Sequence, residues 1–193
     1  MASPRSLQII RDEHASLAAM LQSMRMMVER GPDEGRKTFF DVVRAMLFYI
    51  DEFPERLHHP KESNLLFPKV VKASPKVLGA VDRLERDHMY SEKAARDLQH
   101  LLLSWELLGP SRRAAFEEAF GKYVNFYLDH MSLEEEAILP EAEKVLSAQD
   151  WAEIDAAFEQ NADPLTGHYP PVAEYEKLFS LIVSRAPAPI GLG

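Results

Sequence analysis

Hydrophobic residues recur at alternating spacings of three and four along several segments of the chain, which is the pattern of a helix with one buried face. In the first segment this stripe runs through Leu7, Ile10, His14, Leu17, Leu21, Met24 and Val28. A later segment has the stripe Val77, Val81, Leu84, His88, Ser91, Ala95, Leu98, Leu102 and Trp105. Another has Phe116, Phe120, Tyr123, Tyr127, His130, Glu134 and Ala137. Each stripe predicts an amphipathic helix.

The segment between the first two stripes is less regular. It runs through Phe40, Val43, Leu47, Ile50, Pro54, His58, Glu62 and Leu65. Consecutive spacings of four surround Pro54, and proline removes a backbone hydrogen bond from a helix. The pattern therefore predicts a kinked or restarted helix.

Turn residues separate these segments at 31–33, 74–75, 109–111 and 147–150. Long amphipathic helices joined by short turns predict an all-α fold, an antiparallel up-down-up-down four-helix bundle. We expect the bundle over residues 1–146 and a short C-terminal helical extension, packed on the same domain, over 147–193. In the extension, Asp150 is expected to cap a helix from Trp151 to about Gln160. A last helix is expected over about 171–185, followed by a frayed tail.

The composition, with 46% hydrophobic and 27% charged residues among 193, is that of one globular domain. A net charge of -9 argues against nucleic acid as a partner. No apolar run approaches the roughly 20 residues of a membrane span, and the N-terminus does not resemble a secretory signal. We expect a cytoplasmic protein of bacterial type without a membrane partner. The sequence leaves open whether the protein forms a homo-oligomer.

Each predicted bundle helix carries one histidine on its buried stripe: His14, His58, His88 and His130. A single such histidine is more simply a core residue with a satisfied hydrogen bond. Four in one layer need a common explanation, because burying an unpaired polar group costs roughly 1–3 kcal/mol.

Two of these histidines are followed four residues later by a glutamate on the same stripe. Glu62 follows His58 and Glu134 follows His130, so each pair shares a helix face. A buried carboxylate is unfavourable unless it is paired or binds a cation. The pattern therefore predicts a metal site.

Glu92 stands four residues after His88 but lies one position off the stripe, which passes through Ser91. It is a candidate seventh ligand. On periodicity alone, a solvated glutamate near Lys93 and Arg96 explains it equally well.

The number of candidate ligands exceeds what one four-coordinate ion uses and suits two cations bridged by carboxylates. The chain has no cysteine, so only nitrogen and oxygen ligands are available. Such donors fit iron, manganese or zinc. We expect two iron ions, because helical bundles with inward carboxylates are typical of di-iron proteins.

The motifs that carry these residues resemble those of the hemerythrin or HHE cation-binding family. They are RDEH at 11–14, FPERLHHPKESNLLFP at 53–68, LERDH at 84–88 and HMSLEEEAILP at 130–140. DWAEIDAAF at 150–158 and DPLTG at 163–167 resemble the C-terminal extension of one bacterial subgroup. The resemblance implies that Glu62 and Glu134 bridge two irons. It further implies one iron on His14 and His58 and the other on His88 and His130.

This resemblance implies a non-haem di-iron protein that handles or senses O2, peroxide, nitric oxide or iron. Oxygen carriage is not implied, because Glu92 stands where oxygen-carrying relatives have a further histidine. Two alternatives remain open at this point: a di-iron enzyme acting on peroxide or oxygen, and a helical scaffold with a structural zinc. Whether the protein is an enzyme is therefore left open.

Several other polar residues receive weaker predictions. His59 is expected to point about 100° away from His58 on an α-helix, exposed or behind a ligand. Glu135 is expected on a solvated face, and Glu13 is expected either to be exposed or to orient a ligand. His100 and His168 are expected to be surface or packing residues.

Overall fold

The computed structural model describes residues 4–32, 36–169 and 172–193. Within these ranges every regular element is a helix and no strand occurs, which confirms the all-α prediction. The predicted turn at 31–33 and the predicted start of the last helix near residue 171 fall partly outside the described residues.

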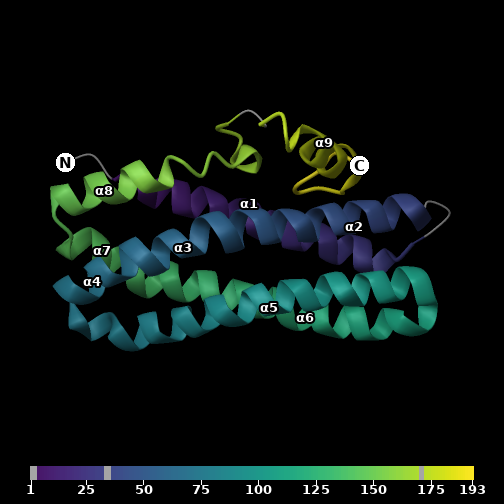
Figure 1. The fold of residues 1–193 in the computed structure, drawn as a ribbon, viewed down its shortest axis with the longest axis horizontal. Helices are drawn as coiled ribbons and strands as arrows, with labels where there is room; N and C mark the ends of the chain where they lie inside the picture. Colours follow the sequence, from purple (N-terminus) through teal and green to yellow (C-terminus); the bar gives the residue numbers. More distant parts are fainter. Residues whose placement is uncertain (1–3, 33–35, 170–171) are drawn as a thin grey trace.

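Long helical rods lie side by side, and successive rods run in opposite directions (Figure 1). The first rod is α1 (Arg5–Arg30). The second is continuous over residues 36–73 and consists of α2 (Arg36–Ile50), η1 (Asp51–His58), α3 (His59–Lys61), η2 (Glu62–Leu66) and α4 (Phe67–Ala73). The next, after the short turn η3 (Pro75–Val77), is α5 (Leu78–Leu108). After η4 (Pro110–Arg112), a continuous rod follows that consists of α6 (Arg113–Leu133), η5 (Glu134–Ile138) and α7 (Leu139–Val145).

The apolar core is divided into two clusters along the bundle. One contains Leu17, Phe53 and Tyr127, and the other contains Ile10 and Ile138. On α1, His14 lies between Ile10 of one cluster and Leu17 of the other. The buried histidines therefore lie in a polar layer between two apolar blocks.

The second rod does not break at Pro54. Instead the helix widens: the backbone N–H of His59 donates to the carbonyl of Pro54, five residues earlier. The same spacing recurs from Phe67 to Glu62 and from Leu139 to Glu134. The segments η1, η2 and η5 are thus π-helical, with a longer hydrogen-bonded turn than an α-helix. The predicted kink is replaced by a change of helical register.

The C-terminal segment begins with α8 (Ala148–Phe158), which packs on α1. Its Ile154 and Phe158 are buried in the same cluster as Ile10. The helix starts earlier than predicted. Ser147 is the N-cap and forms a reciprocal capping box with Asp150, whose carboxylate accepts from the Ser147 backbone N–H at 3.1 Å.

After η6 (Pro164–Thr166), α9 (Glu176–Arg185) packs on α2. The tail that follows was predicted to be frayed, and this prediction is wrong. The backbone N–H of Leu192 donates to the Val183 carbonyl at 2.8 Å, and that of Ile190 donates to Ser23 Oγ at 3.1 Å. These bonds fold the tail back onto the helices.

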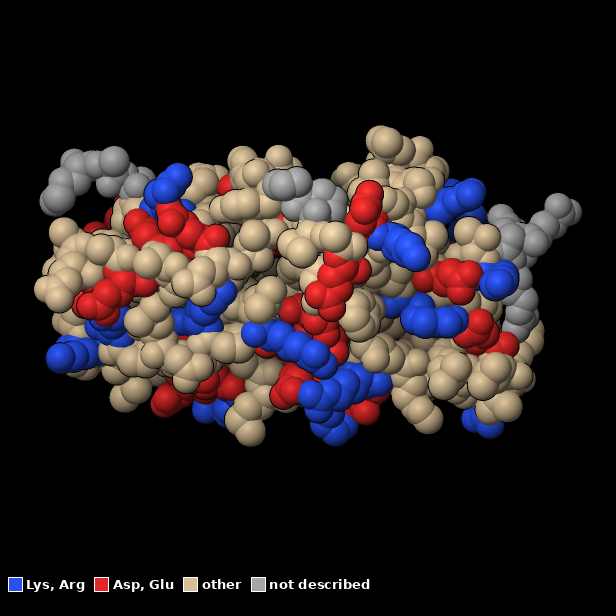
Figure 2. Space-filling model, turned by 45° about the horizontal axis from the view of Figure 1, so that its top comes forward, with Lys and Arg blue, Asp and Glu red and all other residues tan. Residues whose placement is uncertain are grey.

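Charged side chains of both signs are mixed on the face drawn in Figure 2. There, basic side chains lie among an acidic band instead of forming a continuous basic area. Among the helices of the described ranges, none combines the length and the apolar character needed to cross a bilayer.

Asp163 ties the C-terminal segment to the second rod from a buried position. It is only 2% exposed, and its carboxylate accepts from the Tyr49 hydroxyl at 2.5 Å and from the Leu165 backbone N–H at 2.9 Å. Burial outweighs these two hydrogen bonds and raises the pKa of Asp163 from 3.8 to about 6.

We expect Asp163→Asn to change how stability depends on pH. In the wild type, Asp163 ionises near pH 3.8 in the unfolded chain and near pH 6 in the folded protein. Its contribution to the stability of the folded protein therefore falls as pH rises through this window. Linkage makes the loss up to roughly 3 kcal/mol. Asparagine is neutral throughout, so the variant should gain stability relative to the wild type over the same window. Urea unfolding of both metal-free proteins between about pH 4 and pH 7 measures this difference. Parallel stability curves would contradict it.

Candidate metal centre

The polar layer gathers seven potential ligands, and each of the bundle rods described above contributes at least one. Their side chains are all at most 9% exposed. They are His14 on α1, His58 on η1, His59 on α3, Glu62 on η2, His88 on α5, His130 on α6 and Glu134 on η5. Residues far apart in the sequence thus converge in one buried region.

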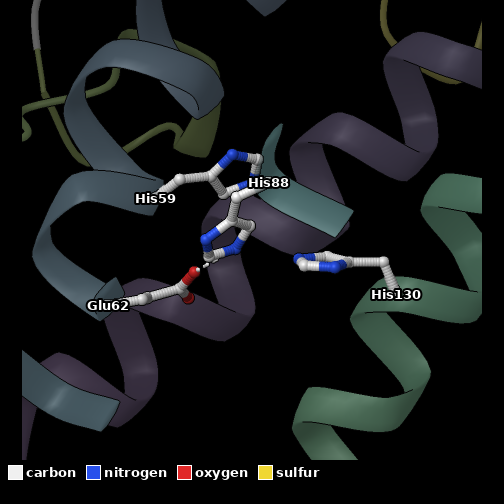
Figure 3. A group of neighbouring side chains, drawn as sticks. All are labelled: His59, Glu62, His88 and His130. Atoms are coloured by element: carbon white, nitrogen blue, oxygen red, sulfur yellow. Dashed lines mark ion pairs between the residues drawn. The ribbon is translucent and has the colours of Figure 1, made fainter. Parts of the chain in front are cut away.

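These side chains form two groups that could each hold a metal ion. One consists of His14, His58, Glu62 and Glu134, and the other of His59, Glu62, His88 and His130. In each group the potential ligand atoms lie within 4.8 Å of one another. Figure 3 shows the second group, whose three rings and carboxylate point toward a common region. Glu62 belongs to both groups.

The ligand atoms are buried without the hydrogen bonds that such atoms need. Among the described residues no hydrogen-bond partner is found for His58 Nε2, His88 Nε2, or either carboxylate oxygen of Glu62 and of Glu134. His58 Nε2 lies 2.7 Å from Glu62 Oε1 and His88 Nε2 lies 3.3 Å from Glu62 Oε2, yet neither contact has hydrogen-bond geometry. Buried polar atoms are normally satisfied. A cation placed among them would satisfy them together, so these residues fit a metal ion.

The π-helical turn explains why both His58 and His59 face the layer. On an α-helix these neighbours would diverge, which is why His59 was predicted to lie outside the site. The bond from the His59 N–H to the Pro54 carbonyl shifts the register just before the pair, and His59 is buried against His88, with ring centroids 4.0 Å apart. The expectation for His59 is therefore corrected. Pro54 was the only signal in the sequence, and it indicated an irregularity without its type.

Two acidic residues orient the histidines of the first group. His58 Nδ1 lies 2.6 Å from Glu13 Oε2, and His14 Nδ1 lies 2.8 Å from Glu135 Oε1. A carboxylate on the second ring nitrogen fixes the ring and leaves Nε2 for a metal. Glu13 thus takes the orienting role that the sequence left open. Glu135 was predicted on a solvated face, and its side chain is indeed 41% exposed, but the sequence did not predict its contact with His14.

The second group has comparable support from hydrogen-bonding neighbours. His59 Nδ1 lies 3.0 Å from Glu55 Oε2, and His88 Nδ1 lies 3.0 Å from Ser63 Oγ. Glu55 is buried and also accepts from the Tyr127 hydroxyl at 2.8 Å. Burial raises the pKa of Glu55 to about 7, although the hydrogen bond from Tyr127 acts in the opposite direction. No sequence pattern had singled out Glu55.

The electrostatics of the layer reflect two carboxylates that face each other away from water. Burial and the neighbouring charge of Glu62 raise the pKa of Glu134 to about 7. Burial alone would lower the pKa of His14, but contacts with Glu134 and Glu135 outweigh it and raise the pKa to about 9. The buried carboxylates thus favour positive charge beside them, here a protonated histidine. A bound cation would supply the same positive charge.

The structure does not bring Glu92 to this layer. Its side chain is exposed and its carboxylate pairs with Arg96 on the same helix. The buried position is Ser91, whose hydroxyl donates to Glu55 at 2.9 Å. Because α5 is α-helical throughout, its stripe keeps the regular register, and Glu92 stays beside it.

Residues 5–142 match the family model described as the hemerythrin HHE cation-binding domain. The chain belongs to this family. The match includes every candidate ligand named above and ends before α8. It confirms the family indicated by the sequence motifs, and with it a cation-binding domain. No curated protein was found to match the chain.

We expect His59→Ala and Glu92→Gln to have opposite outcomes. His59→Ala removes a buried donor of the second group and should weaken cation binding at least about tenfold, since changes merely next to ligands already cost that much. Glu92→Gln alters an exposed ion pair and should leave binding unchanged. Metal analysis after equilibrium dialysis measures both, with the exposed His100→Ala as the control. Full binding in His59→Ala, or clear loss in Glu92→Gln, would contradict this assignment.

Proposed function

We propose that the protein is a non-haem di-iron protein that binds a small oxygen or nitrogen ligand at its metals. The observation that carries the proposal is the pair of buried histidine and glutamate groups that share Glu62. A shared carboxylate between two ligand sets is what a bridged pair of ions requires. The donor set is imidazole and carboxylate, which suits non-haem iron.

In this proposal the histidines divide between the ions as the two groups divide. His14 and His58 would hold one iron, while His59, His88 and His130 would hold the other. Glu62 belongs to both groups and would be a ligand of both ions. Glu134 belongs to the first group, and neither of its oxygens has a hydrogen-bond partner among the described residues, so both are free to bind the first ion.

A narrow cavity beside the ligands supports binding of a small molecule. Its lining includes His14 and His59, one from each group, together with the apolar side chains of Leu17, Pro54 and Met131. Its volume of about 10 Å³ suits a molecule about the size of water, such as a diatomic molecule. Bound iron would supply the coordination and redox chemistry for such a ligand.

Metal analysis and visible spectroscopy of the purified protein test this proposal. We expect about two iron ions per chain with absorption bands of iron in the visible range. His58→Ala and His130→Ala should each lower the iron content sharply, and they should lower the melting temperature of the iron-loaded protein because binding stabilises the folded state. His100→Ala is the matched control.

Stoichiometric zinc with no iron uptake and no colour would contradict the proposal and favour a structural metal. Steady consumption of peroxide by the iron-loaded protein would instead extend the proposal to an enzyme.

A further inference from the structure

The C-terminal segment, which lies beyond the residues matched to the family, reaches the candidate metal centre through Asn161. This residue follows α8 and is only 5% exposed. Its side-chain Nδ2 donates to Glu13 Oε2 at 3.0 Å. The same Glu13 oxygen lies 2.6 Å from His58 Nδ1. A chain of two hydrogen bonds thus joins the C-terminal segment to a candidate ligand.

The other end of the Asn161 amide is also fixed. Lys61 Nζ donates to Asn161 Oδ1, so the oxygen faces Lys61 and the nitrogen faces Glu13. Lys61 lies on α3 between His59 and Glu62, whereas Glu13 lies on α1. Asn161 therefore connects two of the rods that supply candidate ligands of the first group.

Further contacts show that this part of the C-terminal segment packs against the candidate metal centre. The Phe158 ring meets the His58 ring edge-on, with centroids 5.7 Å apart and planes at 84°. Ala162 has a φ of 47°, a left-handed conformation that is unfavourable for a residue other than glycine. It stands between two anchored side chains, those of Asn161 and Asp163. Backbone conformations of this kind persist where neighbouring contacts impose them.

We propose that Asn161 is a positioning residue that holds Glu13 against His58 and thereby slows the loss of a bound cation. Without the amide donor, the Glu13 carboxylate loses one of its two anchors and the His58 ring can turn its Nε2 away from the metal. Hydrogen-bond partners of ligand histidines tune metal affinity by about tenfold to a hundredfold. The inference rests on the proposed metal-binding function.

Asn161→Asp tests this role with little change of shape. The aspartate keeps an oxygen for Lys61 and replaces the N–H donor with an oxygen that repels Glu13. We expect the 193-residue variant loaded with Fe²⁺ to release it to a chelator about tenfold to a hundredfold faster than the wild type. After oxidation to Fe³⁺, the visible spectrum of the variant should also differ from that of the wild type. Asn161→Ala removes the donor without adding charge and should act in the same direction. A wild-type release rate in both variants would overturn the inference.

Asp155→Asn is the matched control. Asp155 lies on α8 and accepts from the Ser6 backbone N–H at 2.8 Å and from its hydroxyl at 2.6 Å, so it fastens the same segment to α1 away from the ligands. We expect this variant to melt at a lower temperature but to keep the wild-type release rate. Equal acceleration in Asp155→Asn and Asn161→Asp would show that the segment acts only through stability, and would overturn the inference.

Running the release assay with both Fe²⁺ and Zn²⁺ separates this inference from the proposed function. Wild-type protein that held Zn²⁺ but not Fe²⁺ would contradict the iron proposal, and the Zn²⁺ release rates would then decide the role of Asn161. Wild-type protein that held neither ion would contradict both. Fe²⁺ retention with no effect of Asn161→Asp or Asn161→Ala would contradict the inference alone.

Discussion

The burial of two carboxylates in the middle of the bundle is the constraint on which the rest of the structure depends. Glu62 and Glu134 are completely buried and have no hydrogen-bond partners among the described residues. Such groups are tolerated only where positive charge compensates them. The surrounding histidines supply part of this charge, and the two apolar clusters on either side exclude water. A bound cation would complete the compensation.

The backbone is adapted to this constraint at the places where the ligands lie. One π-helical segment ends at His58, just before His59, and another begins at Glu62. A third begins at Glu134. A π-helical turn shifts which side chains face inward without ending the helix, and such turns are frequent at functional sites. By contrast α1 and α5 each contribute a single histidine and stay α-helical. Irregular helix geometry is thus concentrated where several ligands must point to one region.

Periodicity predicted the parts of the structure that are regular. It placed His14, His88 and His130 on buried faces, because α1, α5 and α6 keep the α-helical repeat. It missed His59, because the π-helical register depends on backbone hydrogen bonds that no residue pattern specifies. It also could not settle Glu92, which the regular repeat of α5 leaves exposed.

The sequence pattern could not predict contacts between distant segments, for a different reason. Glu135 meets His14 across 121 positions, and Asn161 meets Glu13 across 148. Helical spacing relates only residues of one helix, so partners of this kind emerge only when the rods are packed. The C-terminal segment illustrates the point: its helix was predictable, but its hydrogen bond toward the metal centre was not.

Anomalous X-ray diffraction at the iron absorption edge, from crystals of the iron-loaded protein, tests the central claim most directly. The account predicts two peaks in the polar layer, roughly 3.5–4 Å apart as in other two-metal sites. One should contact His14 and His58, the other His59, His88 and His130, and Glu62 should reach both. A single peak, or peaks only at exposed acidic side chains, would contradict it.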